Sequence, residues 1–254
     1  MLESIIQVRH FTAAHHSATV IDDISFDVYR GEVLVIAGRS GSGKSTVLKH
    51  LIGLYQPVAG HILIAGRDIA TAEEEERTAI LKNIGVTYQM GALFGSMTLL
   101  ENVRLPLEEY TDLPPEAMHL IVRMKLKLVG LETFMDHVPS ELSGGMQKRA
   151  AIARAMALDP QILFLDEPSA GLDPITSAEL DQLILGLARN LKMTFVIVTH
   201  ELASIYAIAD RVIMLDGQTK KIVATGRPQD LRHTSTNRWV RQFFNREASE
   251  EVSG

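Results

Sequence analysis

A glycine-rich segment at residues 38–45 has the residue types and the spacing that bind phosphate groups. The segment reads Gly38-Arg39-Ser40-Gly41-Ser42-Gly43-Lys44-Ser45, with Thr46 next. It fits the pattern Gly-x-x-x-x-Gly-Lys-Ser/Thr, in which the glycines let backbone N–H groups face an anion. Lys44 would bridge the β- and γ-phosphates, and Ser45 would give its hydroxyl to Mg²⁺. The segment therefore predicts a site for a nucleoside triphosphate.

An apolar run that ends in two acidic residues supplies the carboxylates that this chemistry also needs. Residues 162–165 are Ile, Leu, Phe and Leu, and Asp166 and Glu167 follow them. A buried strand delivers the residues at its end to the edge of a sheet, so Asp166 is expected in the Mg²⁺ shell. Glu167, one residue later, is then placed to act as the general base for water. Such a run is common by chance, but in a chain with the phosphate motif it predicts hydrolysis.

The elements around these motifs follow the alternation of an α/β fold. Bounded β-branched runs predict strands at residues 33–37, 84–88, 162–166, 194–199 and 212–215. Helical patterns lie at residues 44–54, 146–157, 176–191 and 202–209. Apolar runs of this length suit strands that are buried on both faces, so we expect a mostly parallel core sheet.

Two regions depart from this alternation. Residues 5–9 and 24–28 favour antiparallel strands, joined by a polar loop that contains His15 and His16. Residues 89–143 carry helical patterns only, which predicts a helical insertion in the α/β core. Within this stretch, helix boundaries are expected at the prolines, namely Pro106, Pro114, Pro115 and Pro139.

Composition narrows the function classes. Among 254 residues, 25 Lys and Arg stand against 31 Asp and Glu, for a formal net charge of −6, and cysteine is absent. An acidic balance argues against broad nucleic-acid binding, and a chain without cysteine has neither disulfides nor thiolate metal ligands. No apolar run approaches the roughly 18–20 residues that cross a bilayer, and the first residues lack the pattern of a signal peptide. We therefore expect a chain that does not span a membrane by itself.

The segment Leu142-Ser143-Gly144-Gly145-Met146-Gln147 completes a set of motifs that resembles the ATP-binding cassette (ABC) ATPases over residues 4–232. The resemblance implies the ABC ATPase form of the P-loop NTPase fold, with a mostly parallel core sheet, an N-terminal antiparallel β subdomain and a helical subdomain. It implies an ATPase domain at residues 1–236, a helical subdomain at about 90–158 and a C-terminal tail at 237–254. It also implies ATP and Mg²⁺ as ligands.

In this family two subunits complete each other's sites as a head-to-tail homodimer. The resemblance implies that the signature residues contact the γ-phosphate held by the other subunit, through a helix N-terminus. The residues that match this role are Ser143, Gly144, Gly145 and Gln147. Asp173, in the D-loop segment 169–173, would lie at the dimer interface.

The remaining positions of the family also have matches. Gln89 matches the Q-loop glutamine, which contacts Mg²⁺ or the attacking water, and His200 matches the switch histidine, which contacts the γ-phosphate. The catalytic set implied is Glu167, His200 and Gln89, and the metal set is Ser45, Gln89 and Asp166. The phosphate segment with Thr46, residues 38–46, would bind ATP.

The sequence departs from the family pattern at the position that stacks on the nucleotide base. Family members often place an aromatic residue two positions past the first strand's Phe, where it stacks on adenine, and after Phe11 that position is Ala13. Phe11, His15 and His16 are candidates to replace the stack, with ordinary surface histidines as the alternative. Weak base stacking would leave most of the affinity in the triphosphate, so GTP is expected to compete with ATP.

Within the family, the helical region resembles the ATPases of Mce-type lipid transporters. The matching segments are 89–94, Met97, 101–103, 105–107, 124–126 and 173–176. This resemblance implies phospholipid transport between the inner and outer membranes, which maintains outer-membrane lipid asymmetry. It implies transmembrane permease subunits, a lipid-binding Mce-type protein and a small cytoplasmic regulatory subunit as partners. The chain would then be peripheral at the cytoplasmic face of the inner membrane, with membrane contact through partner proteins and no nucleic acid.

The tail carries an apolar stripe. Trp239 and Phe243 are one helical turn apart, as are Val240 and Phe244. The stripe either docks on a neighbouring subunit, as the resemblance implies, or packs on its own domain, because periodicity does not identify the partner.

Three other functions share part of the pattern. An ATPase of an importer for a small polar solute would keep every nucleotide motif and differ in the helical region. A soluble ABC ATPase acting on DNA is disfavoured by the acidic balance and by the short, cysteine-free stretch between phosphate and signature motifs. A non-hydrolysing nucleotide-binding module is disfavoured by Glu167.

Overall fold

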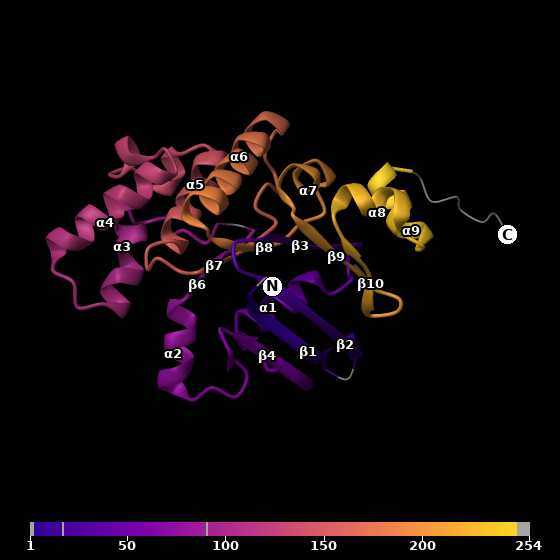
Figure 1. Cartoon of the computed structure of the whole chain (residues 1–254). Helices are drawn as coiled ribbons and strands as arrows, with labels where there is room; N and C mark the ends of the chain where they lie inside the picture. The colour runs from indigo at the N-terminus through magenta and orange to yellow at the C-terminus, as the bar shows by residue number, and fades with distance from the viewer. Residues whose placement is uncertain (1–2, 17, 90, 248–254) are drawn as a thin grey trace. The chain divides into compact units, whose positions relative to one another are not determined.

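A computed structural model describes residues 3–16, 18–89 and 91–247 of the chain (Figure 1). Met90 of the segment 89–94 and residues 248–254 of the predicted tail lie outside the described residues. The chain forms two compact units, one of residues 1–70 with 196–254 and one of residues 71–195. The predicted class, with an antiparallel N-terminal sheet, a mostly parallel core sheet and helices, is confirmed.

The first unit contains the antiparallel sheet, with the strand order β2-β1-β4-β5. Its strands are β1 (Ser4–His15), β2 (Ala18–Tyr29), β4 (Ala59–Ile64) and β5 (Arg67–Asp68). Val8 in the middle of β1 faces Phe26 on one side and Ile62 on the other. The predicted antiparallel pair is confirmed, but both strands are longer than expected. His15 ends β1 rather than lying in a loop, because pairing continues to His15 and Ala18.

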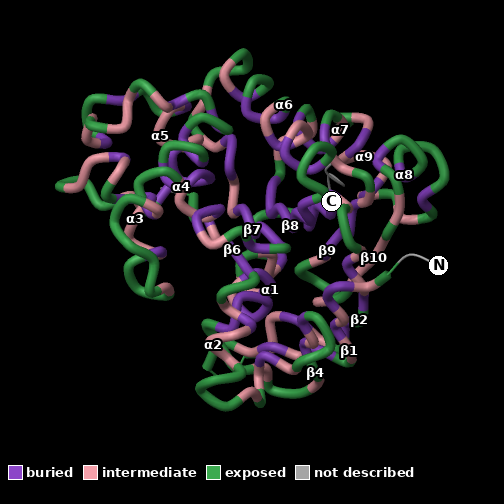
Figure 2. The backbone as a smooth tube through the Cα atoms, turned by 60° about the vertical axis from the view of Figure 1, so that its left-hand side comes forward, coloured by how far each residue is buried: buried purple, intermediate pink, exposed green. Residues whose placement is uncertain are grey.

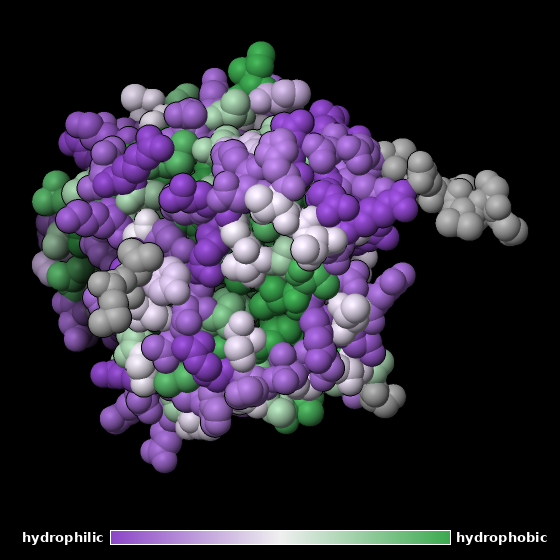
Figure 3. Space-filling model, turned by 45° about the vertical axis from the view of Figure 1, so that its right-hand side comes forward, coloured by the Kyte–Doolittle hydropathy of each residue, from purple (hydrophilic) through white to green (hydrophobic). Residues whose placement is uncertain are grey.

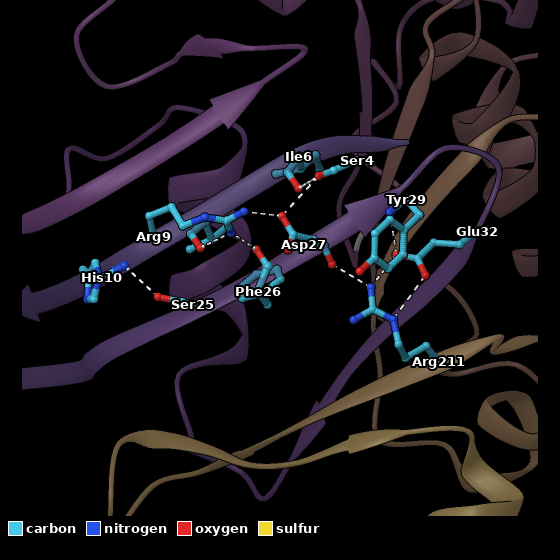
Figure 4. Close-up of polar contacts among 11 residues, drawn as sticks. Ser4, Ile6, Arg9, His10, Ser25, Phe26, Asp27, Tyr29, Glu32 and Arg211 are labelled. Carbon is cyan, nitrogen blue, oxygen red and sulfur yellow. Dashed lines mark hydrogen bonds and ion pairs between the residues drawn. The ribbon is translucent and has the colours of Figure 1, made fainter. Parts of the chain in front are cut away.

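Ion pairs hold this sheet and the start of the next element together (Figure 4). Arg9 on β1 lies 2.6 Å from the Asp27 carboxylate on β2, which also accepts a hydrogen bond from the Ser4 hydroxyl at 3.2 Å. Arg211 donates to the Glu32 carboxylate at 2.6 Å and to the Asp27 carbonyl. Arg211 therefore ties two segments that are far apart in sequence into the same unit.

The first unit also holds the strand that leads into the phosphate segment, together with strands from the later part of the chain. In this unit the strand order is β10-β9-β3-β8, with β3 (Val33–Gly38), β8 (Thr194–Val198), β9 (Arg211–Asp216) and β10 (Lys221–Gly226). β3 runs parallel to β9, with Ile36 opposite Ile213. All six residues of β3 are buried, in agreement with its continuous apolar run. β8 is also buried throughout and is drawn in purple in Figure 2. The helices of this unit are α1 (Lys44–Leu51), α7 (Leu202–Ile208), α8 (Pro228–Thr234) and α9 (Arg238–Asn245).

The second unit pairs two parallel strands and contains the helical region. β6 (Ile84–Thr87) pairs in parallel with β7 (Ile162–Asp166), with Val86 opposite Phe164. Gly85 on β6 lies close to the backbone of Ala155, and a Cβ at Gly85 would be 2.2 Å from the Ala155 carbonyl oxygen. The helices are α2 (Glu74–Lys82), α3 (Leu99–Tyr110), α4 (Pro115–Leu128), α5 (Gly144–Ala155) and α6 (Pro174–Leu191). Among the described residues between 89 and 143 only helices and loops occur, as predicted.

Pro106 was expected to mark a helix boundary, and this prediction is wrong. Pro106 lies inside α3, where its ring removes one backbone hydrogen bond. The helix continues because Val103 and Leu107, on either side of the proline, are buried at 0% and 2% exposure. Packing of that face outweighs the lost bond. The other predicted boundaries hold, since Pro114 caps α4 and Pro139 begins a short 3₁₀ turn.

In the part of the chain that the structure describes, no helix has both the length and the apolar character needed to cross a bilayer. Figure 3 shows a largely polar face on which hydrophobic side chains gather in limited patches. Elsewhere on the surface, α4 exposes Leu120, Met124 and Leu128 at one-turn spacing.

Candidate functional site

The phosphate segment lies in the first unit, between β3 and α1. Gly38 ends β3, and a Cβ there would be 2.4 Å from the Ser42 Oγ and 2.5 Å from the Leu215 carbonyl oxygen. Gly41 and Gly43 have φ angles of 75° and 91°, which residues other than glycine rarely adopt. The three glycines of the motif are therefore required by the local backbone. The loop leads directly into α1, whose first N–H groups have no partner within the helix and present partial positive charge.

The Lys44 ammonium is directed back over this loop. Its Nζ donates to the carbonyl oxygens of Gly38 and Arg39, at 3.0 and 3.1 Å. The Arg39 carbonyl also accepts the Ser42 N–H at 3.1 Å. Two main-chain carbonyls thus hold the positive charge at the mouth of the loop. Ser45 is exposed on the first turn of α1, and Thr46 accepts a hydrogen bond from the His50 ring through its carbonyl.

The turn between β9 and β10 also lies against the phosphate loop, and sequence reasoning missed it. A Cβ on Gly217 would be 3.4 Å from the Ser42 Cα. Hydrogen bonds from Thr219 hold the pKa of Asp216 below its usual value, and the Arg39 charge adds to this effect. No motif marks this turn, because its position follows from the pairing of β9 with β3.

His200 belongs to the same unit as the phosphate loop. It is exposed and follows β8, the neighbour of β3 in the sheet order, so both the histidine and the loop come directly after adjacent strands. The Thr199 N–H donates to the Ile36 carbonyl at 3.4 Å, and the Thr199 hydroxyl accepts the Glu201 N–H at 3.1 Å. These bonds fix the backbone on both sides of His200.

The acidic pair lies in the second unit, at the end of β7. Asp166 is the last residue of the strand. Glu167 has a φ of 46°, in the left-handed region that non-glycine residues seldom occupy. Strained backbone of this kind is concentrated at functional sites. Burial raises the pKa of the Tyr88 hydroxyl, and the charge of Asp166 contributes to the rise.

Lys148 joins the acidic pair to the predicted Q-loop, and sequence reasoning missed it. Its Nζ donates to the Gln89 carbonyl. Burial lowers the pKa of this ammonium, while the carboxylates of Asp166 and Glu167 raise it. In the second unit one cation therefore bonds Gln89 and is influenced by the charges of Asp166 and Glu167. In the sequence, Lys148 is marked only by its position on α5, one turn after the glycines of the signature.

The signature residues form the start of α5. The Ser143 hydroxyl accepts the Met146 N–H at 3.3 Å and caps the helix. The Gln147 amide donates to the carbonyls of Pro139 and Leu142, at 2.9 and 3.2 Å, so it braces the segment before the helix. The role of the signature toward a second subunit stays a prediction.

Asp173 caps α6 in the same unit. Its Oδ1 accepts the N–H groups of Ile175 and Thr176, at 3.0 and 3.1 Å. Hydrogen bonds from Thr176 hold the pKa of Asp173 below its usual value. Gly145 meets this helix closely, because a Cβ there would be 2.3 Å from the Thr176 Cγ2. The signature segment and the D-loop are therefore packed against each other.

This close approach gives a testable prediction. Gly145→Ala should destabilise the protein by about 1–3 kcal/mol, because the new methyl overlaps the Thr176 methyl. Thr176→Ser removes that methyl and keeps the hydroxyl that bonds Asp173. The double variant should therefore recover most of the loss in urea denaturation. Additive losses in the two variants would contradict the predicted clash.

Base recognition has candidates in the first unit. Ala13 and Phe11 are fully buried, and Phe11 packs edge-on against the His50 ring at 5.0 Å, so burial removes both from stacking on a base. His15, His16 and Thr46 line a cavity of about 330 Å³ that is also bordered by Lys49, His50 and Tyr55. Of the three candidates, the two histidines remain.

The predicted residues thus fall into two groups, and each group is assembled within one unit. The phosphate segment 38–46 and His200 belong to the first unit, and Gln89, Asp166, Glu167, the signature and Asp173 belong to the second. In the described residues no cluster of three or more histidine or acidic side chains has the arrangement of a metal site.

Known sequences agree with these features. The family model described as ABC transporter matches residues 21–170, more than half of the chain. "Probable ribonucleotide transport ATP-binding protein mkl" of Mycobacterium leprae is 43% identical over 240 residues, which cover 94% of this chain and 68% of that protein. "Intermembrane phospholipid transport system ATP-binding protein MlaF" of Escherichia coli K12 is 40% identical over 241 residues, 95% of this chain and 88% of that protein. The chain thus spans about two thirds of the M. leprae relative's length.

Solved structures share the fold. The dimeric structure of the ABC transporter cassette MJ0796 has a TM-score of 0.79 and 31% identity, covering 87% of this chain and 98% of that one. A post-hydrolysis state of the same cassette is bound to ADP and Pi. The structure of cbiO1 from Clostridium perfringens, part of an ABC transporter complex, has a TM-score of 0.84 and 27% identity over 91% of this chain and 92% of that one.

Proposed function

The chain belongs to the ABC transporter family, and from this premise we propose that it is the ATP-hydrolysing subunit of a membrane complex that moves phospholipid between inner and outer membranes. The observation that carries ATP hydrolysis is the glycine-dependent loop between β3 and α1, with the Lys44 ammonium at its mouth. The near full-length similarity to proteins named MlaF supports the phospholipid substrate.

Binding of ATP follows from the phosphate loop. Residues 38–46 hold the triphosphate through backbone N–H groups, and Lys44 exchanges its two carbonyl partners for the β- and γ-phosphates. The N-terminus of α1 adds its dipole to this attraction. His200 donates a hydrogen bond to the γ-phosphate.

Mg²⁺ fits the donors that the chain offers. Ser45 in the first unit would supply a hydroxyl oxygen, and Gln89 and Asp166 in the second would supply amide and carboxylate oxygens, the hard ligands that this ion prefers. A site with a single protein carboxylate is usual for Mg²⁺, because substrate phosphates and water complete its shell. When bound, the ion neutralises charge on the β- and γ-phosphates.

Hydrolysis is assigned to the residues around Lys148. Glu167 takes a proton from the attacking water as general base, and Gln89 orients that water. The Lys148 ammonium donates to the Gln89 carbonyl and is attracted by the charges of both carboxylates, so it keeps the Gln89 backbone in position before the reaction.

Two copies of the chain form a head-to-tail dimer in this proposal. The α5 N-terminus, with Ser143, Gly144 and Gly145, then contacts the γ-phosphate held by the partner copy, and Asp173 lies near the interface. Gln147 supports the signature from within its own chain. ATP favours the closed dimer, and hydrolysis removes that preference, which transmits force to the partners.

Those partners are transmembrane permease subunits, with a lipid-binding Mce-type protein and a small cytoplasmic regulatory subunit. The chain is then peripheral at the cytoplasmic face of the inner membrane. An acidic chain of net charge −6 is repelled by an anionic leaflet, so protein contacts hold it there.

The test is purification of the complex from membranes through a tag on this chain, followed by reconstitution into vesicles. Permease subunits and phospholipid should copurify, and ATP should drive transfer of a fluorescent phospholipid to or from acceptor vesicles. A complex that carries Lys44→Ala is the matched control. Intact ATP hydrolysis without lipid transfer would overturn the assignment of phospholipid as the transported substrate, while the assignment of ATPase activity would remain.

A ribonucleotide is the second candidate substrate, since a 43% identical relative carries that name. The same vesicles, loaded with a radiolabelled ribonucleotide, distinguish the two. ATP-dependent movement of the ribonucleotide alone would place the chain with importers of small polar solutes.

Base selectivity is expected to be weak. With Ala13 buried and histidines at the cavity, GTP should displace bound ATP at concentrations within about tenfold of ATP itself. Competition calorimetry checks this. Paired replacement of His15 and His16 by Ala should lower the affinity for both nucleotides, whereas an unchanged affinity would assign these histidines to the surface.

A further inference from the structure

The C-terminal helix α9 touches the phosphate loop through one aromatic side chain. The guanidinium carbon of Arg39 lies 5.2 Å from the centre of the Trp239 ring. Arg39 is the second residue of the phosphate motif, and Trp239 is the second residue of α9. Both belong to the same compact unit. A cation over an indole face at this distance is attracted by the ring's quadrupole.

The Trp239 ring is held in place by the body of its helix. Val240 and Phe244 are buried at 0% and 2% exposure, and the Tyr206 hydroxyl donates to the Phe244 carbonyl at 3.1 Å. The Phe243 ring lies 6.0 Å from the Trp239 ring. Part of the tail stripe therefore packs on its own unit. Docking of the tail on a neighbouring subunit stays a prediction.

Arg39 is connected to the reactive end of the loop through its own carbonyl. That carbonyl accepts hydrogen bonds from the Lys44 ammonium and from the Ser42 N–H, both at 3.1 Å. The charge of the Arg39 side chain also helps to lower the pKa of Asp216, after the hydrogen bonds from Thr219. A shift of Arg39 would therefore move the acceptor that holds Lys44.

We propose that Trp239 is a positioning residue for the phosphate loop: by stacking on Arg39, it fixes the carbonyl that holds Lys44 and links α9 to nucleotide occupancy. The inference rests on the proposed role of residues 38–46 in ATP binding. When ATP draws the Lys44 ammonium to its phosphates, the Arg39 carbonyl loses that partner and the stack adjusts. α9 thereby senses whether the loop is filled.

Affinity is the first readout. Trp239→Leu should weaken Mg-ADP binding about two- to fivefold in calorimetry, the range expected for loss of an exposed cation–π contact. Trp239→Phe keeps an aromatic face and should recover most of the affinity. Tyr29→Leu is the matched control, because Tyr29 stacks on Arg211 at 5.0 Å in the same unit without touching the loop. It should bind Mg-ADP as the wild type does.

Fluorescence is the second readout, since Trp239 is the single tryptophan of the chain. Its emission should change saturably with Mg-ADP, with the midpoint that calorimetry gives. In Arg39→Ala the emission should no longer respond at saturating Mg-ADP, which also controls for absorption by the nucleotide. A purely structural tryptophan would show no such dependence on Arg39.

The results of these experiments test the role of Trp239 separately from the role of residues 38–46 in nucleotide binding. Wild-type binding of Mg-ADP, combined with flat Trp239 emission and an unaltered Trp239→Leu affinity, would overturn the inference alone. Tighter binding by Trp239→Leu would also overturn it, because the stack would then oppose nucleotide. Absence of any wild-type binding in calorimetry would remove the phosphate-site assignment itself.

Discussion

Glu167→Gln should bind ATP with near wild-type affinity and lose about 10²- to 10⁴-fold in turnover, because the amide cannot accept the proton of the attacking water. Glutamine has the same shape and the same tolerance for the backbone at this position, where φ is 46°. The substitution therefore tests the carboxylate and leaves the strand end in place. ATP hydrolysis is measured by phosphate release, and affinity by calorimetry.

The same variant should accumulate as closed dimers when ATP is added, because the step that reopens them is blocked. Size-exclusion chromatography with light scattering detects this. Glu179→Gln, on the exposed side of α6, is the matched control and should hydrolyse ATP normally. Phosphate release at near wild-type rate in Glu167→Gln would assign the base to another residue.

Lys44→Ala should weaken nucleotide binding about thirtyfold or more, the loss expected when one partner of a close charge pair is truncated. Two loop carbonyls accept hydrogen bonds from the Lys44 ammonium, which can turn from them to the phosphates. Alanine at this position removes that positive charge from the site. Calorimetry with Mg-ATP measures the change.

Lys221→Ala is the control for net charge in this experiment. Lys221 lies on β10 in the same unit and pairs at 3.6 Å with Asp22 on the surface. It should leave the affinity unchanged, because exposed ion pairs contribute little. Equal affinities in Lys44→Ala and wild type would contradict the assignment of residues 38–46 to the triphosphate.

The phosphate loop was predictable from the sequence because its constraints are local. Glycine is needed at 41 and 43 for positive φ and at 38 for a close approach, and each requirement falls on a residue type that the pattern displays. The buried strands were equally visible, since β3 and β7 are continuous apolar runs. Roles that act on a second subunit are not encoded locally, and they rest on resemblance.

Lys148 and Trp239 were not predictable as site residues, for a different reason. Each matters through a partner far along the chain, Gln89 in one case and Arg39 in the other. Periodicity places a residue on a face of a helix, but it does not say what meets that face. Pro106 failed as a boundary on similar grounds, because tertiary packing of α3 outweighs a local helix-breaking signal.

The first unit is built from the two ends of the chain, and this has a consequence for synthesis. The Val33 N–H donates to Asp210 at 2.9 Å, and Glu32 pairs with Arg211 at 2.6 Å, so β3 depends on a strand that is made much later than β3 itself. Residues 71–195 are contiguous and can collapse on the ribosome while β3 still waits for β9. A nascent chain that stops before β9 therefore carries the phosphate motif without the sheet that shapes it. A ligand stabilises only the state that it binds. ATP in the cell therefore stabilises chains in which β9 has formed, whereas chains that stop before β9 gain no such stability and are open to proteolysis.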